Sequence, residues 1–272
     1  DAAGEIGGQF NLAKRIPGKE EFYETLRYFR HRIGETGVDL QLGRCIDAAD
    51  LQDYDEVVLA TGVTPRHVDI PGVSHPKVVS YLDVLAGRVD VGKRAAIIGA
   101  GGIGFDVAEF LAHHVPPADG GQPALDAKRW MAEWGIDASF ESRGGVVPAR
   151  HEPSVRQLWL LQRSAGKPGA RLGKTTGWIH RATLKAKGVK MIGGIEYLGV
   201  DDRGLRIRVA GAEEILAVDH VVICAGQESR RDLLSHLQEE GRSVHVIGGA
   251  DRAVELDAKR AIAQGSRLAS IL

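Results

Sequence analysis

The stretch Ala95–Phe105 reads AAIIGAGGIGF, an apolar run that breaks into glycines with the spacing GxGxxG. A strand that ends in such a loop and leads directly into a helix is the arrangement that binds the diphosphate of a dinucleotide. Gly99 allows a tight turn, Gly101 lets the backbone approach the phosphates, and Gly104 lets the helix pack closely on the strand. A glycine-rich turn without a ligand is the alternative. The predicted phosphate-binding residues are Gly99, Gly101, Gly102, Ile103 and Gly104.

Composition restricts the class of partner. The 272 residues include 35 basic and 36 acidic side chains, so the chain has no broad positive field for a nucleic acid or an anionic membrane surface. No apolar stretch approaches the roughly 20 residues that span a bilayer, and the glycine-rich start does not resemble a signal peptide. We therefore expect a soluble, cytoplasmic protein that binds small molecules and has no nucleic-acid or membrane partner.

The two cysteines, Cys45 and Cys224, are far apart in the sequence and are not part of a CxxC pair. Their spacing argues against a metal ion, an iron–sulfur cluster or a redox-active dithiol in this segment. Both are expected to pack as small apolar residues.

Hydrophobic periodicity divides the chain into alternating strands and helices, which is the pattern of an α/β protein. Helices are predicted at residues 19–36, 103–113, 177–187 and 255–271, with a short one near 128–134. Strands are predicted at residues 38–42, 56–62, 94–98, 158–161, 189–192 and 205–209, and within 220–228 and 243–251. Prolines and mixed composition from about residue 115 to about residue 155 indicate an insertion.

The last segment contributes one strand and one helix, which cannot bury their own apolar faces. They must return to the first unit, and this makes that unit discontinuous. The sequence therefore predicts two nested Rossmann-like dinucleotide-binding domains. Residues 1–88 and 228–272 form the outer domain, and residues 89–227 form the domain inserted into it.

The end of the second strand predicts which nucleotide the glycine loop binds. An acidic residue that binds the ribose is expected about 20 residues after the loop, but that distance falls at Asp119 within the insertion. The second strand is therefore displaced to residues 158–161, and its end carries Arg163 and Lys167. Basic side chains at this position suit a ribose 2′-phosphate, so we predict NADP. A solvated basic loop is the alternative.

Further glycine turns surround this inserted domain. Asp1–Phe10 reads DAAGEIGGQF, and the strands VVLATG and VIGGAD each end in a glycine turn. In this order they resemble the flavoprotein reductases in which an FAD domain is interrupted by an NAD(P)H domain. Four longer stretches narrow the resemblance further: EIGGQFNLAKRIPGKEEFYETLRY, AAIIGAGGIGFD, LGKTTGWIHR and ELDAKRAIAQG. They are similar to the carboxy-terminal half of the bacterial NADPH-dependent 2,4-dienoyl-CoA reductase family, over essentially the whole chain.

The resemblance implies a chain of electron carriers. In this family NADPH reduces FAD, a 4Fe-4S cluster passes electrons to FMN, and FMN reduces a 2,4-dienoyl-CoA during β-oxidation of unsaturated fatty acids. The cluster and FMN are expected only in an amino-terminal (β/α)8 barrel domain, which is the implied partner. The first strand of the FAD domain and its own GxGxxG loop are expected before Asp1. Without them, the chain is expected to hold FAD poorly.

The resemblance also implies an FAD site in the turns that follow the flanking strands and at the start of the last helix. Asp1 would bind the ribose hydroxyls, and residues 256–258 would direct a helix N-terminus at the flavin pyrimidine. Trp178 would stack on a ring near the flavin, with a core or interface tryptophan as the alternative. The implied FAD-binding residues are Asp1, Gly8, Gln9, Ala60, Thr61, Gly62, Trp178, Gly249, Asp251, Leu256, Asp257 and Ala258.

The nicotinamide ring would be flanked by Ala225, Gly226 and Gln227. No catalytic side chain is expected, because the hydride passes between two cofactors that the protein juxtaposes. Two other functions stay open at this point. One is a non-catalytic nucleotide-binding module, and the other is the reductase half of a trimethylamine-dehydrogenase-like flavoprotein.

Overall fold

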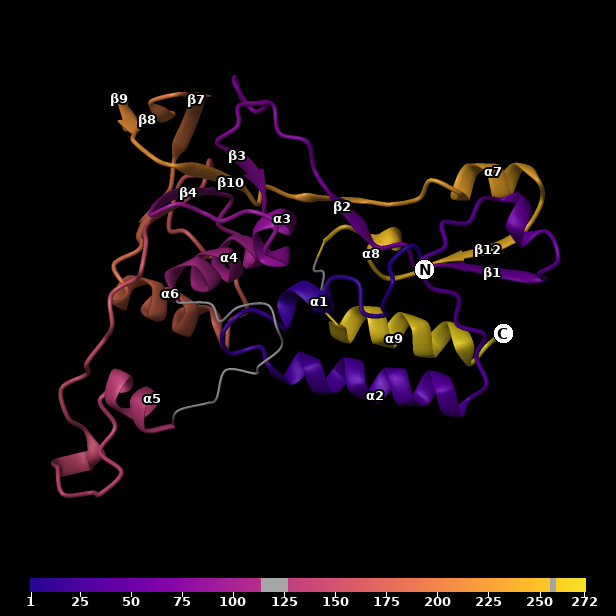
Figure 1. Cartoon of the computed structure of the whole chain (residues 1–272), viewed down its shortest axis with the longest axis horizontal. Coiled ribbons are helices and arrows are strands. Elements are labelled where there is room, and N and C mark those ends of the chain that lie inside the picture. The colour runs from indigo at the N-terminus through magenta and orange to yellow at the C-terminus, as the bar shows by residue number, and fades with distance from the viewer. Residues whose placement is uncertain (114–126, 255–257) are drawn as a thin grey trace. The chain divides into compact units, whose positions relative to one another are not determined.

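The computed structural model describes residues 1–113, 127–254 and 258–272, which divide into two units (Figure 1). Unit 1 comprises Asp1–Gly8, Arg30–His67 and Gly226–Leu272, and unit 2 comprises Gln9–Phe29 and Val68–Ala225. Unit 2 therefore takes up more of the chain than the inserted domain that we predicted at residues 89–227. The reason is that Ile16 and Tyr81 are part of its hydrophobic core.

Unit 2 is built on a five-stranded parallel sheet. Its strand order is β3 (Val78–Ser80), β10 (His220–Ile223), β4 (Arg94–Ile98), β5 (Gln157–Leu161) and β6 (Lys190–Ile192). From β4 the chain adds β5 and β6 on one side and later returns to add β10 on the other side. This reversal is the topological switch point at which α/β sheets bind their ligands. The predicted displacement of the second strand is confirmed, because β5 pairs with β4.

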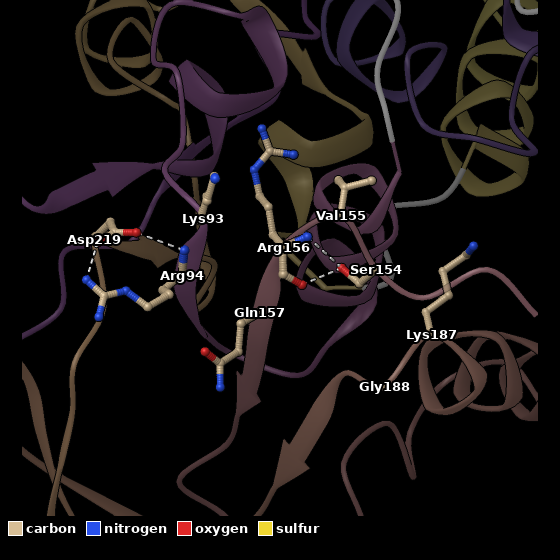
Figure 2. Close-up of a pocket in the computed structure, with 9 residues that line it drawn as sticks. All are labelled: Lys93, Arg94, Ser154, Val155, Arg156, Gln157, Lys187, Gly188 and Asp219. Atoms are coloured by element: carbon tan, nitrogen blue, oxygen red, sulfur yellow. Dashed lines mark hydrogen bonds and ion pairs between the residues drawn. The ribbon is translucent and has the colours of Figure 1, made fainter.

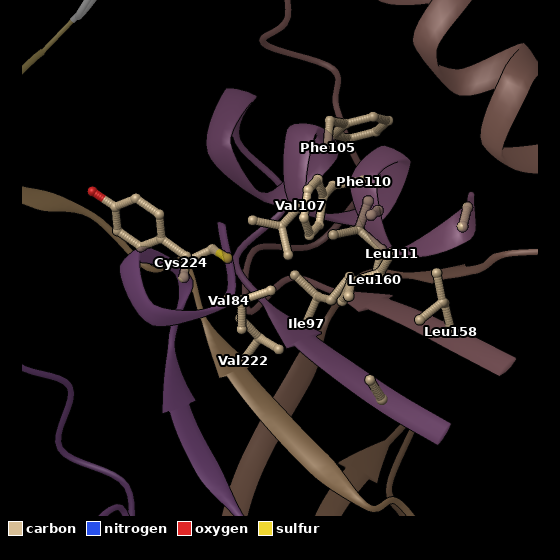
Figure 3. Close-up of a cluster of buried hydrophobic side chains, with 14 of the residues drawn as sticks. Val84, Ile97, Phe105, Val107, Phe110, Leu111, Leu158, Leu160, Val222 and Cys224 are labelled. Atoms are coloured by element: carbon tan, nitrogen blue, oxygen red, sulfur yellow. The ribbon is translucent and has the colours of Figure 1, made fainter. Parts of the chain in front are cut away.

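Alternate residues of β4 face two different layers. Ala95 and Ile97 pack with side chains of α3 (Tyr81–Ala86), α4 (Gly102–Ala112) and α6 (Gly177–Ala186), as Figure 3 shows around Ile97. Ala96 and Ile98 pack with an antiparallel sheet of β7 (Ile195–Asp201), β8 (Gly204–Val209) and β9 (Ala212–Leu216). Both faces of β4 are therefore buried from Ala95 onward, and this explains the uninterrupted apolar run from Ala95 to Ile98.

Two further segments pack on the helical layer of unit 2. The first contains α1 (Phe10–Ala13) and the start of α2 (Glu21–Glu35), and Lys19 Nζ lies 2.7 Å from both carboxylate oxygens of Asp106 on α4. The second is the described part of the predicted insertion, with α5 (Ala127–Trp134) and the 3-10 turn η2 (Arg143–Gly145), where Glu133 of α5 pairs with Lys187 at the end of α6. Across the described ranges, no helix combines the length and the apolar character that crossing a membrane requires.

Unit 1 contains two small pairs of strands. β1 (Glu56–Leu59) pairs in parallel with β12 (Ser243–Val246), and β2 (Val63–Pro65) pairs in antiparallel with β11 (Gln227–Ser229). The β1–β12 pairing brings the last strand back to the first unit, as expected. The other described elements of unit 1 are the end of α2, η1 (Ala49–Leu51), α7 (Leu234–Glu239), α8 (Gly248–Asp251) and α9 (Ala258–Ala269).

Two sequence-based expectations for unit 1 are wrong. Residues 38–42 form no strand, and Val38 and Leu40 are 56% and 42% exposed. Their alternating pattern therefore belongs to an extended surface segment. Its end bonds to the first residues of the chain, because the amino group of Asp1 donates to the carbonyl oxygen of Gln41 over 2.7 Å and the N–H of Gly43 donates to the carbonyl oxygen of Ala3 over 2.9 Å. Cys45 is exposed and does not pack in the core, whereas Cys224 is buried as expected.

Candidate functional site

The glycine loop between β4 and α4 has two positions that only glycine can occupy. Gly99 has φ 110°, and a Cβ atom there would lie 2.7 Å from the carbonyl oxygen of Cys224. A Cβ atom on Gly104 would lie 1.7 Å from the carbonyl oxygen of Gly99. A real Cβ atom cannot approach a carbonyl oxygen this closely. The loop therefore turns tightly against the end of β10, and α4 packs directly on the turn.

Gly101 and Gly102 face open space in this structure. A Cβ atom at either position would meet no other heavy atom within 4 Å, apart from its chain neighbours and its own helix. α4 begins at Gly102, so its free N–H groups point out of the first turn beside these two glycines. Close backbone approach together with free N–H groups suits a diphosphate. The residues present therefore fit the diphosphate of a dinucleotide.

The basic loop, which we define as residues 162–176, leaves the same edge of the sheet as the glycine loop. Ile98 pairs with Leu161, and the N–H of Gly99 donates to the carbonyl oxygen of Leu161 over 2.8 Å. No residue between 162 and 176 is acidic. Within the part of the chain that the structure describes, none of its four cations makes an ion pair. They are Arg163, Lys167, Arg171 and Lys174, and all four are exposed.

Side chains outside our sequence-based site hold the basic loop in place. Gln162 Nε2 donates to the carbonyl oxygens of Ser164 and Gly166, over 3.0 and 3.2 Å. Arg181 Nη1, from α6, donates to the carbonyl oxygen of Gly169 over 2.7 Å. Sequence patterns did not identify Arg181, because a basic residue in an amphipathic helix also fits a solvated face.

Cys224 lies next to the glycine loop at the switch point. The thiol is buried, and the N–H of Cys224 donates to the carbonyl oxygen of Ile98 over 2.8 Å. Burial raises the pKa of this thiol far above its usual range, and the Asp106 carboxylate raises it further. Cys224 is therefore a protonated packing residue, and it is not a thiolate nucleophile.

The turns of unit 1 contain most of the residues implied for FAD. Ala60, Thr61 and Gly62 follow β1, and the hydroxyl of Thr61 donates to the carbonyl oxygen of Arg230 over 2.5 Å. Gly249 lies in α8 and is closely packed, because a Cβ atom there would lie 3.1 Å from the carbonyl carbon of Gly62. The turn after β1 and the turn after β12 are thus in contact at the carboxyl ends of two parallel strands, where α/β sheets bind their ligands.

Gln264 of α9 ties the start of α8 to its end. Its Oε1 accepts from the N–H of Gly248 over 2.8 Å, and its Nε2 donates to Asp251 Oδ2 over 2.8 Å. One oxygen of Asp251 is therefore already engaged with the protein. Ala258 begins α9, while Leu256 and Asp257 lie outside the described residues.

The other predicted residues are divided between the two units. Asp1 and Gly8 lie in unit 1, and Oδ1 of Asp1 accepts from the N–H of Ala3 over 2.8 Å. Gln9 and Trp178 lie in unit 2, and Ala225 is the last residue of unit 2. Gly226 and Gln227 begin the last segment of unit 1. Trp178 is 59% exposed, which excludes a core position and leaves the alternative of an interface tryptophan open.

A separate concavity of about 730 Å³ lies at the opposite edge of the sheet (Figure 2). Arg94 and Gln157 begin β4 and β5 there, whereas the glycine and basic loops follow the ends of these strands. Most of its charged side chains have structural roles. Arg94 pairs with Asp219 over 2.6 Å, and Arg156 donates to the carbonyl oxygens of Val91 and Leu111. We therefore assign the candidate site to the glycine loop and the basic loop, and not to this concavity.

A buried carboxyl group lies further along α4. The side chain of Glu109 is 14% exposed, and its Oε2 atom is buried without a hydrogen bond. Burial raises the pKa of Glu109 to about 7; the Glu133 and Asp106 carboxylates add to the rise, and Lys187 opposes it. Lys187 is itself buried and pairs with Glu133 over 3.1 Å.

We expect Glu109→Gln to stabilise the protein at pH 8. The folded state keeps the Glu109 proton up to about pH 7, whereas the unfolded chain releases it near pH 4.5. Wild type therefore loses stability as the pH rises through this window, by about 3 kcal/mol from this group. Urea unfolding at pH 4.5 and pH 8 measures the change, with the exposed Glu239→Gln as control. A variant that is equally destabilised at both pH values contradicts the prediction.

The chain is similar to known flavoproteins. The profile of the family described as pyridine nucleotide-disulphide oxidoreductase matches residues 29–251. Among curated proteins, the metal reductase of Desulforamulus reducens is 26% identical over 252 residues, which cover 90% of this chain and 36% of that protein. The chain spans about a third of the length of such curated relatives.

Solved structures show the same fold. A complex of 2-naphthoyl-CoA reductase with 2-naphthoyl-CoA has a TM-score of 0.77 and 20% identity, over 98% of this chain and 34% of that chain. Histamine dehydrogenase from Rhizobium sp. 4-9 has a TM-score of 0.72 and 17% identity, over 99% and 39%. At these identities the likeness shows the fold alone. The family match, which covers most of the chain, implies an oxidoreductase module with FAD and a nicotinamide cofactor. This α/β chain belongs to the pyridine nucleotide-disulphide oxidoreductase family.

Proposed function

We propose that the chain is an oxidoreductase module that passes a hydride from NADPH to FAD. The observation that carries the choice of NADPH is the basic loop beside the glycine loop. Arg163 and Lys167 follow β5, whose end is paired with the end of β4, and the basic loop has no carboxylate. In Rossmann domains the end of this neighbouring strand meets the adenosine ribose. Cations without an acidic partner suit a 2′-phosphate at that point.

The protein's part in this reaction is to bind and orient. NADPH supplies the hydride when it is bound, and the flavin accepts it. Gly101 and Gly102 would cradle the diphosphate with backbone N–H groups, and Arg163 would hold the 2′-phosphate. Ala225, Gly226 and Gln227 would flank the nicotinamide. The turns at residues 60–62 and 248–251, with Asp1, Gly8, Gln9, Trp178 and the start of α9, would hold FAD. No side chain has to transfer a proton, because positioning the two cofactors is sufficient.

We further propose that the electrons continue to a barrel domain with a 4Fe-4S cluster and FMN, which reduces a 2,4-dienoyl-CoA. The sequence resemblance supports this, and so does the length of the relatives, of which this chain spans about a third. The fold is shared with a reductase whose structure holds an acyl-CoA thioester. A second candidate is the corresponding module of an amine-oxidising flavoprotein, which the likeness to histamine dehydrogenase favours. Faster flavin reduction by NADPH than by NADH would favour the first candidate over a module that does not use NADPH.

Flavin reduction tests the proposed function directly. The purified chain is mixed with FAD under anaerobic conditions, and the visible absorption band of the flavin is followed after NADPH is added. We expect bleaching that is faster with NADPH than with NADH at equal, subsaturating concentrations. Free FAD without the protein is the control, since NADPH reduces free flavin slowly. FAD is supplied in excess, because the chain by itself is expected to hold it poorly. If no bleaching exceeds the free-FAD control even then, a non-catalytic nucleotide-binding module is the better description.

A further inference from the structure

We propose that Arg181 is a positioning residue for the 2′-phosphate, which acts by holding the basic loop on the core of unit 2. This inference rests on the proposed function, because it explains how that site prefers NADPH. Arg181 lies on α6, after the basic loop in the sequence, and its own side chain is half-buried. Its guanidinium group reaches back to the loop, where Nη1 donates to the carbonyl oxygen of Gly169 over 2.7 Å.

Gly169 is the point at which the basic loop contacts the helix of the glycine loop. Its φ is 72°, and a Cβ atom there would lie 2.6 Å from the ring of Phe105. Phe105 follows Gly104 directly and is 2% exposed, so its ring is fixed in the core of α4. The bond from Arg181 therefore holds Gly169 against the same helix whose first turn would receive the diphosphate.

The first half of the loop has its own anchor. Gln162 Nε2 bonds the carbonyl oxygens of Ser164 and Gly166, and the N–H of Gly194 donates to the carbonyl oxygen of Ser164 over 2.9 Å. Arg163 lies within this first half. Lys167 lies between the two anchors, two residues before Gly169, and the N–H of Ala170 donates to its carbonyl oxygen over 3.2 Å.

The two anchors have different consequences for binding. Because Gln162 holds the turn that carries Arg163, loss of Arg181 leaves that turn in place. Lys167 and the residues up to Leu172 would instead lose their fixed position, and ordering them again would weaken binding. This loss concerns the 2′-phosphate only, because the glycine loop does not depend on Arg181. Arg181 thus sets the distance between Lys167 and the diphosphate site.

The test compares Arg181→Met with Lys185→Met, which removes the same charge one helical turn later at an exposed position. NADP⁺ and NAD⁺, which differ only in the 2′-phosphate, are titrated into the whole chain by calorimetry. We expect Arg181→Met to weaken NADP⁺ binding about 10-fold, equivalent to ordering one further backbone residue. NAD⁺ binding should change less than about 2-fold, and Lys185→Met should change neither. Arg181→Lys keeps a donor and is expected to recover most of the affinity.

Hydrogen exchange separates positioning from charge. Positioning requires faster amide exchange at residues 167–172 in Arg181→Met, with exchange at residues 99–105 unchanged. An unchanged affinity for NADP⁺, an equal loss with Lys185→Met, a loss with Arg181→Lys as large as with Arg181→Met, or a weaker affinity without faster exchange overturns the proposal. If wild type binds NADP⁺ and NAD⁺ equally, the proposed NADPH function itself fails, and the role of Arg181 fails with it. A preference in wild type that is undiminished in Arg181→Met refutes the role of Arg181 alone.

Discussion

Gly104→Ala is expected to abolish nucleotide binding by unit 2. The new Cβ atom would lie 1.7 Å from the carbonyl oxygen of Gly99 and is attached directly to the backbone of a buried helix turn. Neither can move without the other, so α4 has to shift away from the turn or the turn has to open. Either movement displaces the N–H groups that would face the diphosphate, and we expect NADP⁺ and NAD⁺ to bind at least 100-fold more weakly. Titration calorimetry with both nucleotides measures the loss.

The control for this variant is Gly34→Ala, a glycine in α2 that has nothing within 4 Å of the added Cβ atom. This change should leave binding intact and stabilise the helix slightly. Overpacking at Gly104 also costs about 1–3 kcal/mol of stability, so circular dichroism has to show that the variant is folded at the temperature of the titration. A folded Gly104→Ala protein with wild-type affinity would show that the diphosphate does not bind at this loop.

Most of unit 2 could be predicted because its signals are local. The apolar run of β4, the glycine spacing and the periodicity of α4 each act over a few residues, and the structure has them where the pattern placed them. The displaced strand β5 could also be inferred, since the insertion has too many prolines to be the second strand. Residues 38–42 alternate between apolar and polar side chains as a strand does, but they form no strand in the structure. Pairing is decided by distant residues, which a local pattern does not contain.

The candidate site also contains residues that the sequence could predict and residues that it could not. The glycines and Arg163 could be named from the sequence, because their roles depend on position relative to a strand end. The anchors Gln162 and Arg181 could not, because each acts through a main-chain carbonyl oxygen that any residue type can supply. Cys45 shows the opposite error: a residue type that is usually buried is exposed here, because it lies in an irregular segment outside the core.

Arg163→Ala is expected to weaken NADPH binding by about 10- to 100-fold and to leave NADH binding unchanged. Arg163 is exposed and makes no ion pair within the described residues, so its guanidinium group is available to a ligand. A charge-assisted hydrogen bond to the 2′-phosphate contributes roughly 1.5–3 kcal/mol, which corresponds to that loss. Stability should change by less than about 0.5 kcal/mol, because an exposed side chain away from the core is removed. Fluorescence titration with NADPH and NADH compares the two affinities.

The control for Arg163→Ala is Arg203→Ala, which removes an exposed arginine from the turn between β7 and β8 of the same unit. It tests whether the overall charge of the protein alone attracts NADPH. Such long-range attraction is screened by salt, whereas a direct contact is screened less. We therefore expect wild type to keep its preference for NADPH over NADH at raised salt. Arg203→Ala should show the same preference as wild type. Equal loss of NADPH and NADH binding in Arg163→Ala would place this side chain on the diphosphate or the adenine. In that case the ribose 2′-phosphate would have to be read by Lys167, two residues before the carbonyl that Arg181 holds.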